Sequence, residues 1–287
     1  MNKQPISIII PAHNEKSVIA KCLENLIQCS DTIAPEIIVV CNGCRDNTAE
    51  IVRSFGKAVR CIETSAASKV NALNLGDKAA SYFPRIYLDA DIQFSLDDIW
   101  KVVKEMEQKN ALAAAPRMQM DLSGSSWMVR SYYDIWCNLP YCREGMIGAG
   151  VYALSEKGRT FFAEFPDIIA DDRYIRALFK ENQRIGVKNA VSIISAPTNL
   201  KGLIKIKTRS RLGGYEFESR FPELLDNETK AYGTALMELA GKFTLWHKAA
   251  VYLGINLLTR IRAGQQVKTK GFNHWERDDS SREKSKH

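Results

Sequence analysis

Short apolar runs alternate with amphipathic stretches over the first hundred residues, and this alternation most limits the folds open to the chain. Residues 6–10 read ISIII, and three later runs are similarly apolar or β-branched, namely 36–41, 59–63 and 85–88. Between them, segments such as 17–29 place apolar residues on one helical face. Strands that alternate with helices in this way are typical of parallel βαβ units. The sequence therefore predicts an α/β protein with a mostly parallel central sheet flanked by helices.

The rest of the chain continues this pattern and then changes character. Residues 97–108 and 171–179 are expected to be helices, and residues 111–116 and 187–194 to be strands. After residue 202 the sequence becomes basic and then helical. We therefore expect an α/β domain over residues 1–202 with two halves (about 1–115 and 116–202), a basic helical extension over 203–272, and a flexible polar tail over 273–287.

Composition narrows the class of protein. With 45% apolar and 25% charged residues, the chain has the make-up of an ordinary globular protein. The sequence contains no run of about 18 apolar residues, so it predicts no membrane span. The start of the chain resembles a strand rather than a signal peptide. Seven scattered cysteines suit reduced thiols better than a disulfide framework. The spacing of Cys41 and Cys44 lacks the second Cys or His pair of a metal site. We therefore expect a cytoplasmic protein.

The net charge of +7 is unevenly distributed. Five cations and no acid lie between Lys201 and Arg211. Such a block could face phosphates, nucleic acid or an anionic membrane surface, and a plain solvated face is an equal alternative.

Asp89 and Asp91 form the most informative pair of acids. They follow an apolar run, and residues two apart in an extended segment point the same way. Both carboxylates could therefore reach one cation, and paired oxygens suit Mg²⁺ or Mn²⁺ that in turn holds a diphosphate. Taken alone, an acid pair at a strand end is more often a turn or a cap.

Other polar groups follow the neighbouring strands. The segment Pro11-Ala12-His13-Asn14-Glu15 follows the first strand, Asn42 begins a polar turn after the second, and Lys69 opens a helix after the third. The carboxyl ends of parallel strands meet at one sheet edge, where open α/β sheets bind ligands. Four strands would thus deliver polar groups to one place.

This succession of motifs resembles the family-two glycosyltransferases over roughly residues 5–180. The resemblance implies a Rossmann-like GT-A fold that uses a nucleotide-sugar, with the donor bound by about the first 115 residues and the acceptor by 116–202. It assigns Pro11, Ala12 and Glu15 to the nucleoside pocket and Lys69 to the diphosphate. Asn42 stands where the family usually has an Asp that contacts uracil, and its amide can still pair with a pyrimidine. Asp89 would lie near ribose and phosphate, and Asp91, with Asp89, would bind the metal.

Two downstream segments extend the resemblance. Residues 148–155 resemble the glycine-rich segment beside the acceptor, and residues 170–173 resemble the family's Glu-Asp pair. The second acid is the catalytic base there, which implies Asp172, with Asp171 as the fallback. A carboxylate that takes the proton of the acceptor hydroxyl accelerates transfer about 10²–10⁴-fold. The alternative is a capped helix start with a charged first turn.

Three features leave alternatives open. Arg209 and Arg211 would either close over the diphosphate from a mobile loop or lie on a solvated surface. The aromatic residues between Trp127 and Tyr141 favour helix packing over a sugar-stacking platform. The stretch 242–262 favours packing on the core over rest on a membrane surface.

The resemblance implies an inverting, metal-dependent hexosyltransferase. It would use a UDP-sugar and a glycan or lipid-linked acceptor in cell-envelope or extracellular polysaccharide synthesis. We expect Mg²⁺ or Mn²⁺, peripheral membrane contact through the basic C-terminal part at the inner face of the cell membrane, and no nucleic-acid partner. The alternatives are a non-catalytic polyanion- or carbohydrate-binding protein and a sugar-nucleotide pyrophosphorylase. The Gly-x-Gly-x-x-Gly of a dinucleotide dehydrogenase does not occur.

Overall fold

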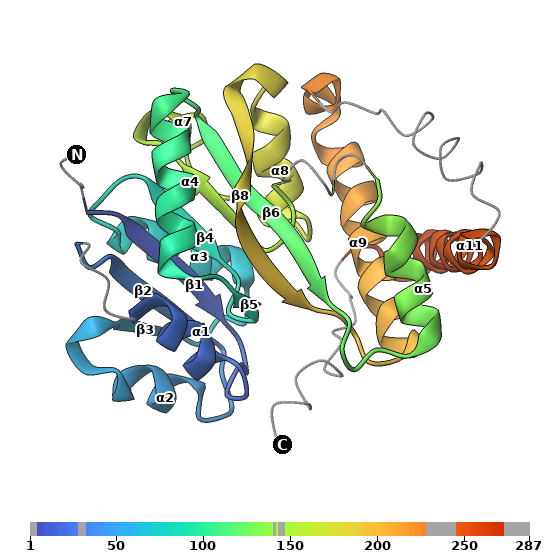
Figure 1. Ribbon diagram of the computed structural model, residues 1–287, viewed down its shortest axis with the longest axis horizontal. Coiled ribbons are helices and arrows are strands. Elements are labelled where there is room, and N and C mark those ends of the chain that lie inside the picture. The colour runs from blue at the N-terminus through green and yellow to red at the C-terminus, as the bar shows by residue number, and fades with distance from the viewer. Residues whose placement is uncertain (1–4, 28–32, 140–141, 143–146, 228–244, 273–287) are drawn as a thin grey trace.

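The computed structural model describes residues 5–27, 33–139, 142, 147–227 and 245–272 (Figure 1). A single eight-stranded sheet, in the order β3-β2-β1-β4-β7-β6-β8-β5, runs through the molecule. Its strands are β1 (Ser7–Ala12), β2 (Glu36–Asn42), β3 (Arg60–Thr64), β4 (Arg85–Leu88), β5 (Ile92–Gln93), β6 (Ala113–Asp121), β7 (Val151–Leu154) and β8 (Arg184–Ser195).

Helices connect and cover these strands. The α-helices are α1 (Ile19–Ile27), α2 (Thr48–Ser54), α3 (Lys69–Ala79), α4 (Leu96–Gln108), α5 (Trp127–Trp136), α7 (Glu156–Arg159), α8 (Asp171–Leu178), α9 (Leu200–Arg220) and α11 (Trp246–Lys270). Short 3₁₀ turns are η1 (Gly56–Ala58), η2 (Glu181–Gln183) and η3 (Pro222–Asn227). The α/β class expected from the sequence is confirmed.

The sheet has a parallel half and a mixed half. Strands β3, β2, β1 and β4 are all parallel. Beyond β4 the direction changes, because β7 is antiparallel to both β4 and β6, while β8 runs parallel to β6. Every residue of β1 is buried, as expected for a parallel strand that is covered on both faces. The carboxyl ends of the four parallel strands therefore lie along one edge.

The core forms two layers, one on each face of the sheet. Ile8 and Ile10 of β1 pack with α1, α2 and α4, whereas Ile9 packs with α3 and α8 on the other face. This alternation follows from the two-residue period of a strand. Gly76 of α3 allows the close approach, because a Cβ atom there would lie 2.5 Å from Ile9 Cγ2.

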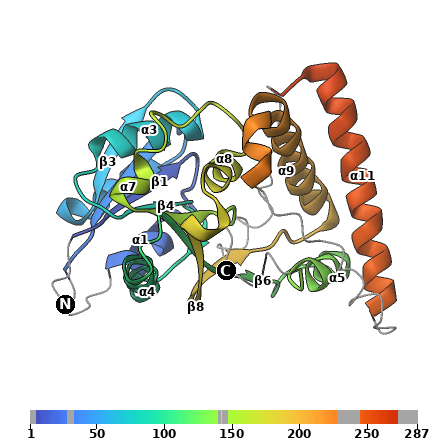
Figure 2. The ribbon, with the colours of Figure 1, turned by 90° about the horizontal axis from the view of Figure 1, so that it is seen from above.

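Helices α5, α9 and α11 form a separate helical unit beside β6 and β8 (Figures 1 and 2). Val129, Tyr132 and Tyr133 of α5 are buried against Leu203 of α9 and Ile255 of α11. The packing role expected for these aromatic residues is thus confirmed for the two tyrosines. Tyr141 lies outside the described residues. No helix of the described segments is long and apolar enough to cross a membrane.

Lys207 of α9 lies among the aromatic rings of α5. Its Nζ is 3.9 Å from the centroid of the Trp136 ring and 5.1 Å and 5.2 Å from those of Tyr133 and Tyr132. None of the ion pairs between described residues includes Lys207. Burial lowers the pKa of its ammonium to about 8.

The basic segment after the sheet differs from expectation. Residues 201–211 belong to α9, so of the two alternatives for Arg209 and Arg211 the mobile loop is wrong. Asn199 caps the helix by accepting a hydrogen bond from Gly202 N at 3.0 Å. Lysine, arginine, leucine and isoleucine then continue it without a breaker until Gly213. The helix begins at Leu200, slightly before the expected boundary at residue 202.

Candidate functional site

Four polar groups converge at the edge where the parallel strands end. Lys69 opens α3, just after its N-cap Ser68, and Asp89 follows β4 directly. Asp171 and Asp172 begin α8 on the other side of the edge. These positions come from distant parts of the chain, and the sheet brings them together as the sequence predicted.

Lys69 joins the two sides. Its Nζ lies 2.8 Å from Asp89 Oδ1 and 3.3 Å from Asp171 Oδ2. Burial alone would lower the pKa of this ammonium, but the charges of Asp171, Asp89 and Asp172 together raise it above its ordinary value. Lys69 therefore stays a cation between carboxylates.

The two acids at the start of α8 differ in how deeply they are buried. Asp171 is 3% exposed, and burial raises the pKa of its carboxyl to about 6, with Lys69 opposing the rise and Asp172 and Asp89 adding to it. Asp172 is half-buried, and its Oδ1 accepts a hydrogen bond from Arg173 N at 2.7 Å. Asp171 thus holds the lysine, and Asp172 is the more open of the two.

Tyr152 of β7 was not singled out in the sequence. Its ring stacks on Tyr87 at 4.9 Å, and its hydroxyl is buried with no hydrogen-bond partner in the described chain. Burial raises the pKa of the phenol, and the charge of Asp171 raises it further. Only its place just after a glycine-rich segment hints at this position beside the acids.

Asp91 and Glu15 extend the acidic group toward α1. Burial raises the pKa of the Cys22 thiol to about 12, and the charges of Asp91, Glu15 and Asp89 add to the rise, in that order. Glu15 is itself buried. Asp91 lies two residues after Asp89, which Lys69 joins to Asp171, the neighbour of Asp172.

A glycine packs closely beside Asp89. Gly150 has φ +77°, and its carbonyl accepts a hydrogen bond from Asp89 N at 2.8 Å. A Cβ atom at this glycine would lie 2.9 Å from Ile92 Cγ1 and 3.3 Å from Asp89 Oδ2. Both the left-handed backbone and the close approach therefore require glycine.

The acids fit a divalent cation that is shared with a substrate. In the described part of the chain, no three His, Cys, Asp or Glu side chains are grouped as a complete metal site. Mg²⁺, however, is usually held by one or two carboxylates together with substrate phosphates. Asp89 and Asp91, two residues apart after β4, could supply these carboxylates.

The ends of β1 and β2 form a second polar region. Pro11 and Ala12 are buried at the end of β1. Asn42 is 3% exposed, and its Oδ1 has no hydrogen-bond partner among the described residues. Its main-chain oxygen lies 2.5 Å from His13 Nδ1, which fixes the turn after β1 against β2. An unpaired buried acceptor is costly, so a ligand N–H at this point would be stabilising.

A hollow of about 430 Å³ opens at the ends of β2 and β3. It is lined by Cys41, Gly43, Cys44, Arg45, Glu63, Thr64 and Ser65. Gly43 has φ +58°, and a Cβ atom there would lie 2.7 Å from Ala67 Cβ. The hollow therefore adjoins Asn42 in the chain and in the sheet.

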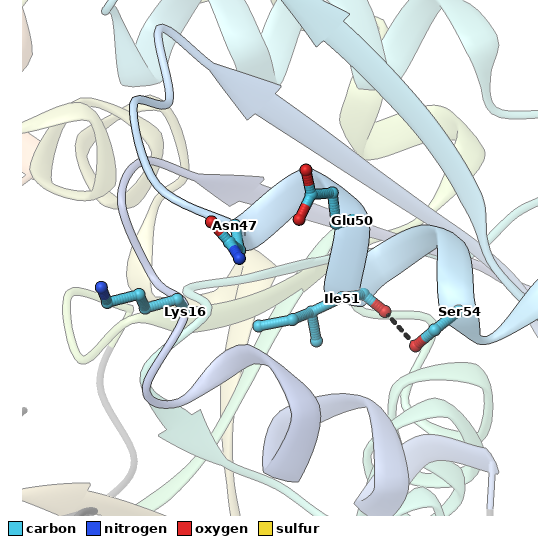
Figure 3. A pocket seen from close by; sticks show the side chains of 5 residues that line it. All are labelled: Lys16, Asn47, Glu50, Ile51 and Ser54. Atoms are coloured by element: carbon cyan, nitrogen blue, oxygen red, sulfur yellow. Dashed lines mark hydrogen bonds between the residues drawn. The ribbon is translucent and has the colours of Figure 1, made fainter.

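A hollow of similar size, about 440 Å³, lies beside α2 (Figure 3). Lys16 reaches it from the turn after β1, and Asn47, Glu50, Ile51 and Ser54 line it from the start and body of α2. None of the converging acids lines it, so it is not the centre of this site.

Arg211 is committed to the helical unit. Its Nη2 donates to Asn256 Oδ1 at 2.7 Å and its Nε to Thr259 Oγ1 at 3.3 Å, both on α11. Arg209 lies on the same helix, more than two turns from either end. The structure thus does not bring Arg211 to the Lys69 cluster.

Another part of α9 does reach the site. Glu216 Oε2 accepts a hydrogen bond from Ile169 N at 2.8 Å, and Arg173 Nη1 donates to the carbonyl of Gly214 at 3.0 Å. A Cβ atom at Gly213 would lie 3.0 Å from Ala170 Cβ. The Gly213-Gly214 pair inside a helix was the sequence signal of this close contact, and sequence reasoning missed it.

Residues 7–152 match the model of the family described as glycosyl transferase family 2. Poly-beta-1,6-N-acetyl-D-glucosamine synthase from Staphylococcus aureus (strain COL) is 26% identical over 240 residues, which cover 75% of this chain and 58% of the synthase. The chain spans about half the length of the curated relatives it matches.

Two solved structures share the fold. Mannosyltransferase PcManGT from Pyrobaculum calidifontis, in complex with GDP-Man and Mn²⁺, is similar at a TM-score of 0.62 and 18% identity, covering 94% of this chain and 77% of that chain. Glucosyl-3-phosphoglycerate synthase from Mycobacterium tuberculosis, in complex with Mn²⁺, UDP-glucose and phosphoglyceric acid, is similar at 0.55 and 17%, covering 75% and 79%. The fold is that of the GT-A glycosyltransferases.

Proposed function

Because this chain belongs to glycosyl transferase family 2, we propose that it transfers a sugar from a UDP-sugar to a hydroxyl group, with inversion at the anomeric carbon. The observation that carries the proposal is the position of Lys69, whose ammonium contacts both Asp89 and Asp171. Acids from the two halves of the domain thus face one small region. Sugar transfer requires the donor diphosphate and the acceptor hydroxyl to be held close together in such a region.

The donor nucleoside is proposed to lie at the ends of β1 and β2. Pro11, Ala12 and Glu15 line this end of β1, and the unpaired Oδ1 of Asn42 suits the ring N–H of uracil. The complex of glucosyl-3-phosphoglycerate synthase with UDP-glucose supports this choice of base, whereas PcManGT was solved with GDP-Man. A GDP-sugar is therefore the donor to test against it.

The diphosphate is proposed to lie between Lys69 and the acids that follow β4. Asp91 and Asp89 would hold Mg²⁺ or Mn²⁺, which when bound neutralises charge on the leaving diphosphate. Both solved relatives described above contain Mn²⁺. Lys69 supplies a fixed cation at the same place, because its raised pKa keeps it protonated.

Asp172 is proposed as the base, with Asp171 as the alternative. Asp172 lies half-exposed in the first turn of α8, where its carboxylate can accept the proton of an acceptor hydroxyl. Asp171 is held by Lys69 and is almost fully buried, which suits a positioning role.

The acceptor is proposed to be a glycan or a lipid-linked sugar in cell-envelope or extracellular polysaccharide synthesis. The similarity to a poly-beta-1,6-N-acetyl-D-glucosamine synthase supports this setting. A cytoplasmic enzyme at the inner face of the membrane would fit such an acceptor. The polyanion-binding alternative is weakened, because Lys207 and Arg211 of the basic block contact α5 and α11.

The test uses purified full-length protein with a panel of UDP- and GDP-sugars and Mn²⁺, and measures release of nucleoside diphosphate. Asp91→Ala should abolish metal-dependent donor binding, measured by titration calorimetry. Asp172→Asn should retain donor binding and lose transfer by about 10²–10⁴-fold. Asp97→Asn, at an exposed acid of α4, is the matched control and should behave as wild type.

No release with any donor would contradict the proposed function. Wild-type transfer by Asp172→Asn together with loss in Asp171→Asn would move the base to Asp171.

A further inference from the structure

The outer face of α11 exposes large apolar side chains. Leu253 and Leu257 are each 60% exposed, Trp246 is 57% exposed and Ile261 is 50% exposed. Their spacing of seven, four and four residues places them on one side of the helix. The opposite side, which carries the buried Ile255, faces α5 and α9. In Figure 2, α11 runs along the outer edge of the molecule.

The apolar surface continues onto the start of α5. Trp127, which is 57% exposed, stacks against His247 of α11 with ring centroids 6.2 Å apart, and Met128 beside it is exposed too. Soluble monomers rarely expose large contiguous apolar patches without a use for them. We call this surface, formed by Trp127, Met128, Trp246, Leu253, Leu257, Leu258 and Ile261, the apolar face.

Positive charge borders the apolar face. Helix α11 contains five cations and no acid, namely Lys248, Arg260, Arg262, Lys268 and Lys270. Lys248 pairs with Asp134 of α5 at 2.6 Å. Arg260, Lys268 and Lys270 are exposed, and all lie toward the C-terminal end of the helix. The tryptophans lie at the other end, so the helix has an aromatic end and a basic end.

We propose that the apolar face docks the protein on an anionic lipid membrane, with α11 lying in the plane of the surface. Leucine, isoleucine and tryptophan side chains would enter the boundary between headgroups and acyl chains, and the exposed cations would contact anionic headgroups. Helix α11 is not apolar enough to cross a membrane, so in this proposal it lies on the surface.

The charges favour a lipid surface over a second copy of the chain. A two-fold dimer through α11 would place the same patch of both subunits together. Each copy would bring the exposed cations Arg260, Lys268 and Lys270 and no acid from this helix, so the pairing would place like charges together. Anionic lipid, in contrast, supplies the missing negative charge.

The experiment measures flotation of the full chain with vesicles, without donor or acceptor, so it does not depend on the proposed function. The vesicles are phosphatidylcholine alone or phosphatidylcholine mixed with phosphatidylglycerol. Wild type should float with the anionic vesicles and be released in part by high salt, because its cations are then screened. The double variant Leu253→Gln, Leu257→Gln should lose binding by about tenfold or more, since two apolar anchors are removed.

Two further variants separate the contributions. Lys268→Gln with Lys270→Gln should weaken binding to anionic vesicles and leave any binding to neutral vesicles unchanged. Ile33→Gln, at an exposed apolar residue 46% exposed and outside the apolar face, is the matched control and should bind as wild type. Circular dichroism establishes that each variant is folded.

Other outcomes overturn the proposal. Failure of folded wild type to bind anionic vesicles would overturn it, as would wild-type binding by the Leu253→Gln, Leu257→Gln variant. Light scattering that shows a dimer, converted to a monomer by these substitutions, together with no vesicle binding, would assign the apolar face to self-association instead.

Discussion

Two lysines of this protein occupy opposite environments. Lys69, at the sheet edge, contacts two carboxylates, and the charges around it raise its pKa. Lys207, in the helical unit, contacts three aromatic rings, and burial lowers its pKa to about 8. Each is half-buried, so burial alone does not distinguish them.

The difference arises from how each region is built. At the sheet edge, parallel strands end side by side, and each turn can deliver a polar residue to the same space. In the helical unit, α5 and α9 pack through their faces, and Lys207 contacts aromatic rings and forms no ion pair with the described residues. Chemistry is therefore expected at Lys69, and packing at Lys207.

The largest expected effect tests this contrast directly. Lys69→Met should reduce sugar transfer by about 10²–10⁴-fold, because it removes a preorganised cation and leaves Asp171 buried without its partner. Lys207→Met should change transfer by less than about threefold, because its ring contacts accept an apolar chain of similar length. Steady-state rates with the same donor compare the two. An equal loss in both variants would show that the contrast is wrong.

Asp77 of α3 carries a charge that we expect to stabilise the fold, in contrast to Lys69, which we expect to take part in transfer. At the far end of this helix from Lys69, buried Asp77 pairs with Arg85 at 2.7 Å and with Arg159 at 2.7 Å, and accepts a hydrogen bond from Tyr87 at 2.5 Å. Asp77→Ala should lower the free energy of unfolding by about 3–5 kcal/mol, because the largely buried guanidinium groups of Arg85 and Arg159 lose their acid partner. Urea denaturation measures this change.

The control for Asp77→Ala is a neighbouring surface pair. Lys78 and Glu164 form an ion pair with both side chains largely exposed. Glu164→Ala should leave the urea midpoint unchanged. If Glu164→Ala destabilised the protein as much as Asp77→Ala, burial would not be the reason for the effect.

The smallest expected effect concerns pH. Burial raises the pKa of Asp171 to about 6, so its ion pair with Lys69 is lost as the pH falls through that value. Its ionised form is disfavoured in the folded state, so this group destabilises the fold above its unfolded pKa. Asp77 has the opposite sign, because Arg159 and its other partners lower the pKa of its carboxyl, and its stabilisation is lost only at more acidic pH.

Transfer should therefore fall by about tenfold per pH unit below about 6 while the protein stays folded. A pH profile of transfer, taken together with circular dichroism at each pH, checks both statements. Unfolding in the same window as the loss of transfer would contradict the separation between Asp171 and Asp77.

The parallel half could be predicted from sequence because its signals are local. An apolar run followed by a polar turn gives both a strand and the place where its residues emerge, which is how Asp89 and Lys69 were assigned to one edge. Which acid of the 171–172 pair faces Lys69 could not be predicted, because it depends on how α8 is oriented by α9. The Asp77 cluster was missed, since its partner Arg159 comes from a distant segment.

Helix α9 showed the limits of charge patterning. Five cations suggested a solvated or phosphate-binding loop, yet Arg211 bonds to α11 and Lys207 lies on aromatic rings. Net charge in a sequence window does not reveal which side of a helix each cation occupies. The packing partners decide that.

The adjacent glycines Gly213 and Gly214 let α9 connect the helical unit to the loop before Asp171. Arg211 of α9 donates to Asn256 of α11, and two residues later Gly213 lies so close to the loop before Asp171 that a Cβ atom there would be 3.0 Å from Ala170 Cβ. Because only two residues of one helix separate these contacts, α11 and the loop before α8 are attached to the same turn of α9. The helix that carries the apolar face and the loop that leads into the acid pair are thus held by neighbouring residues of α9.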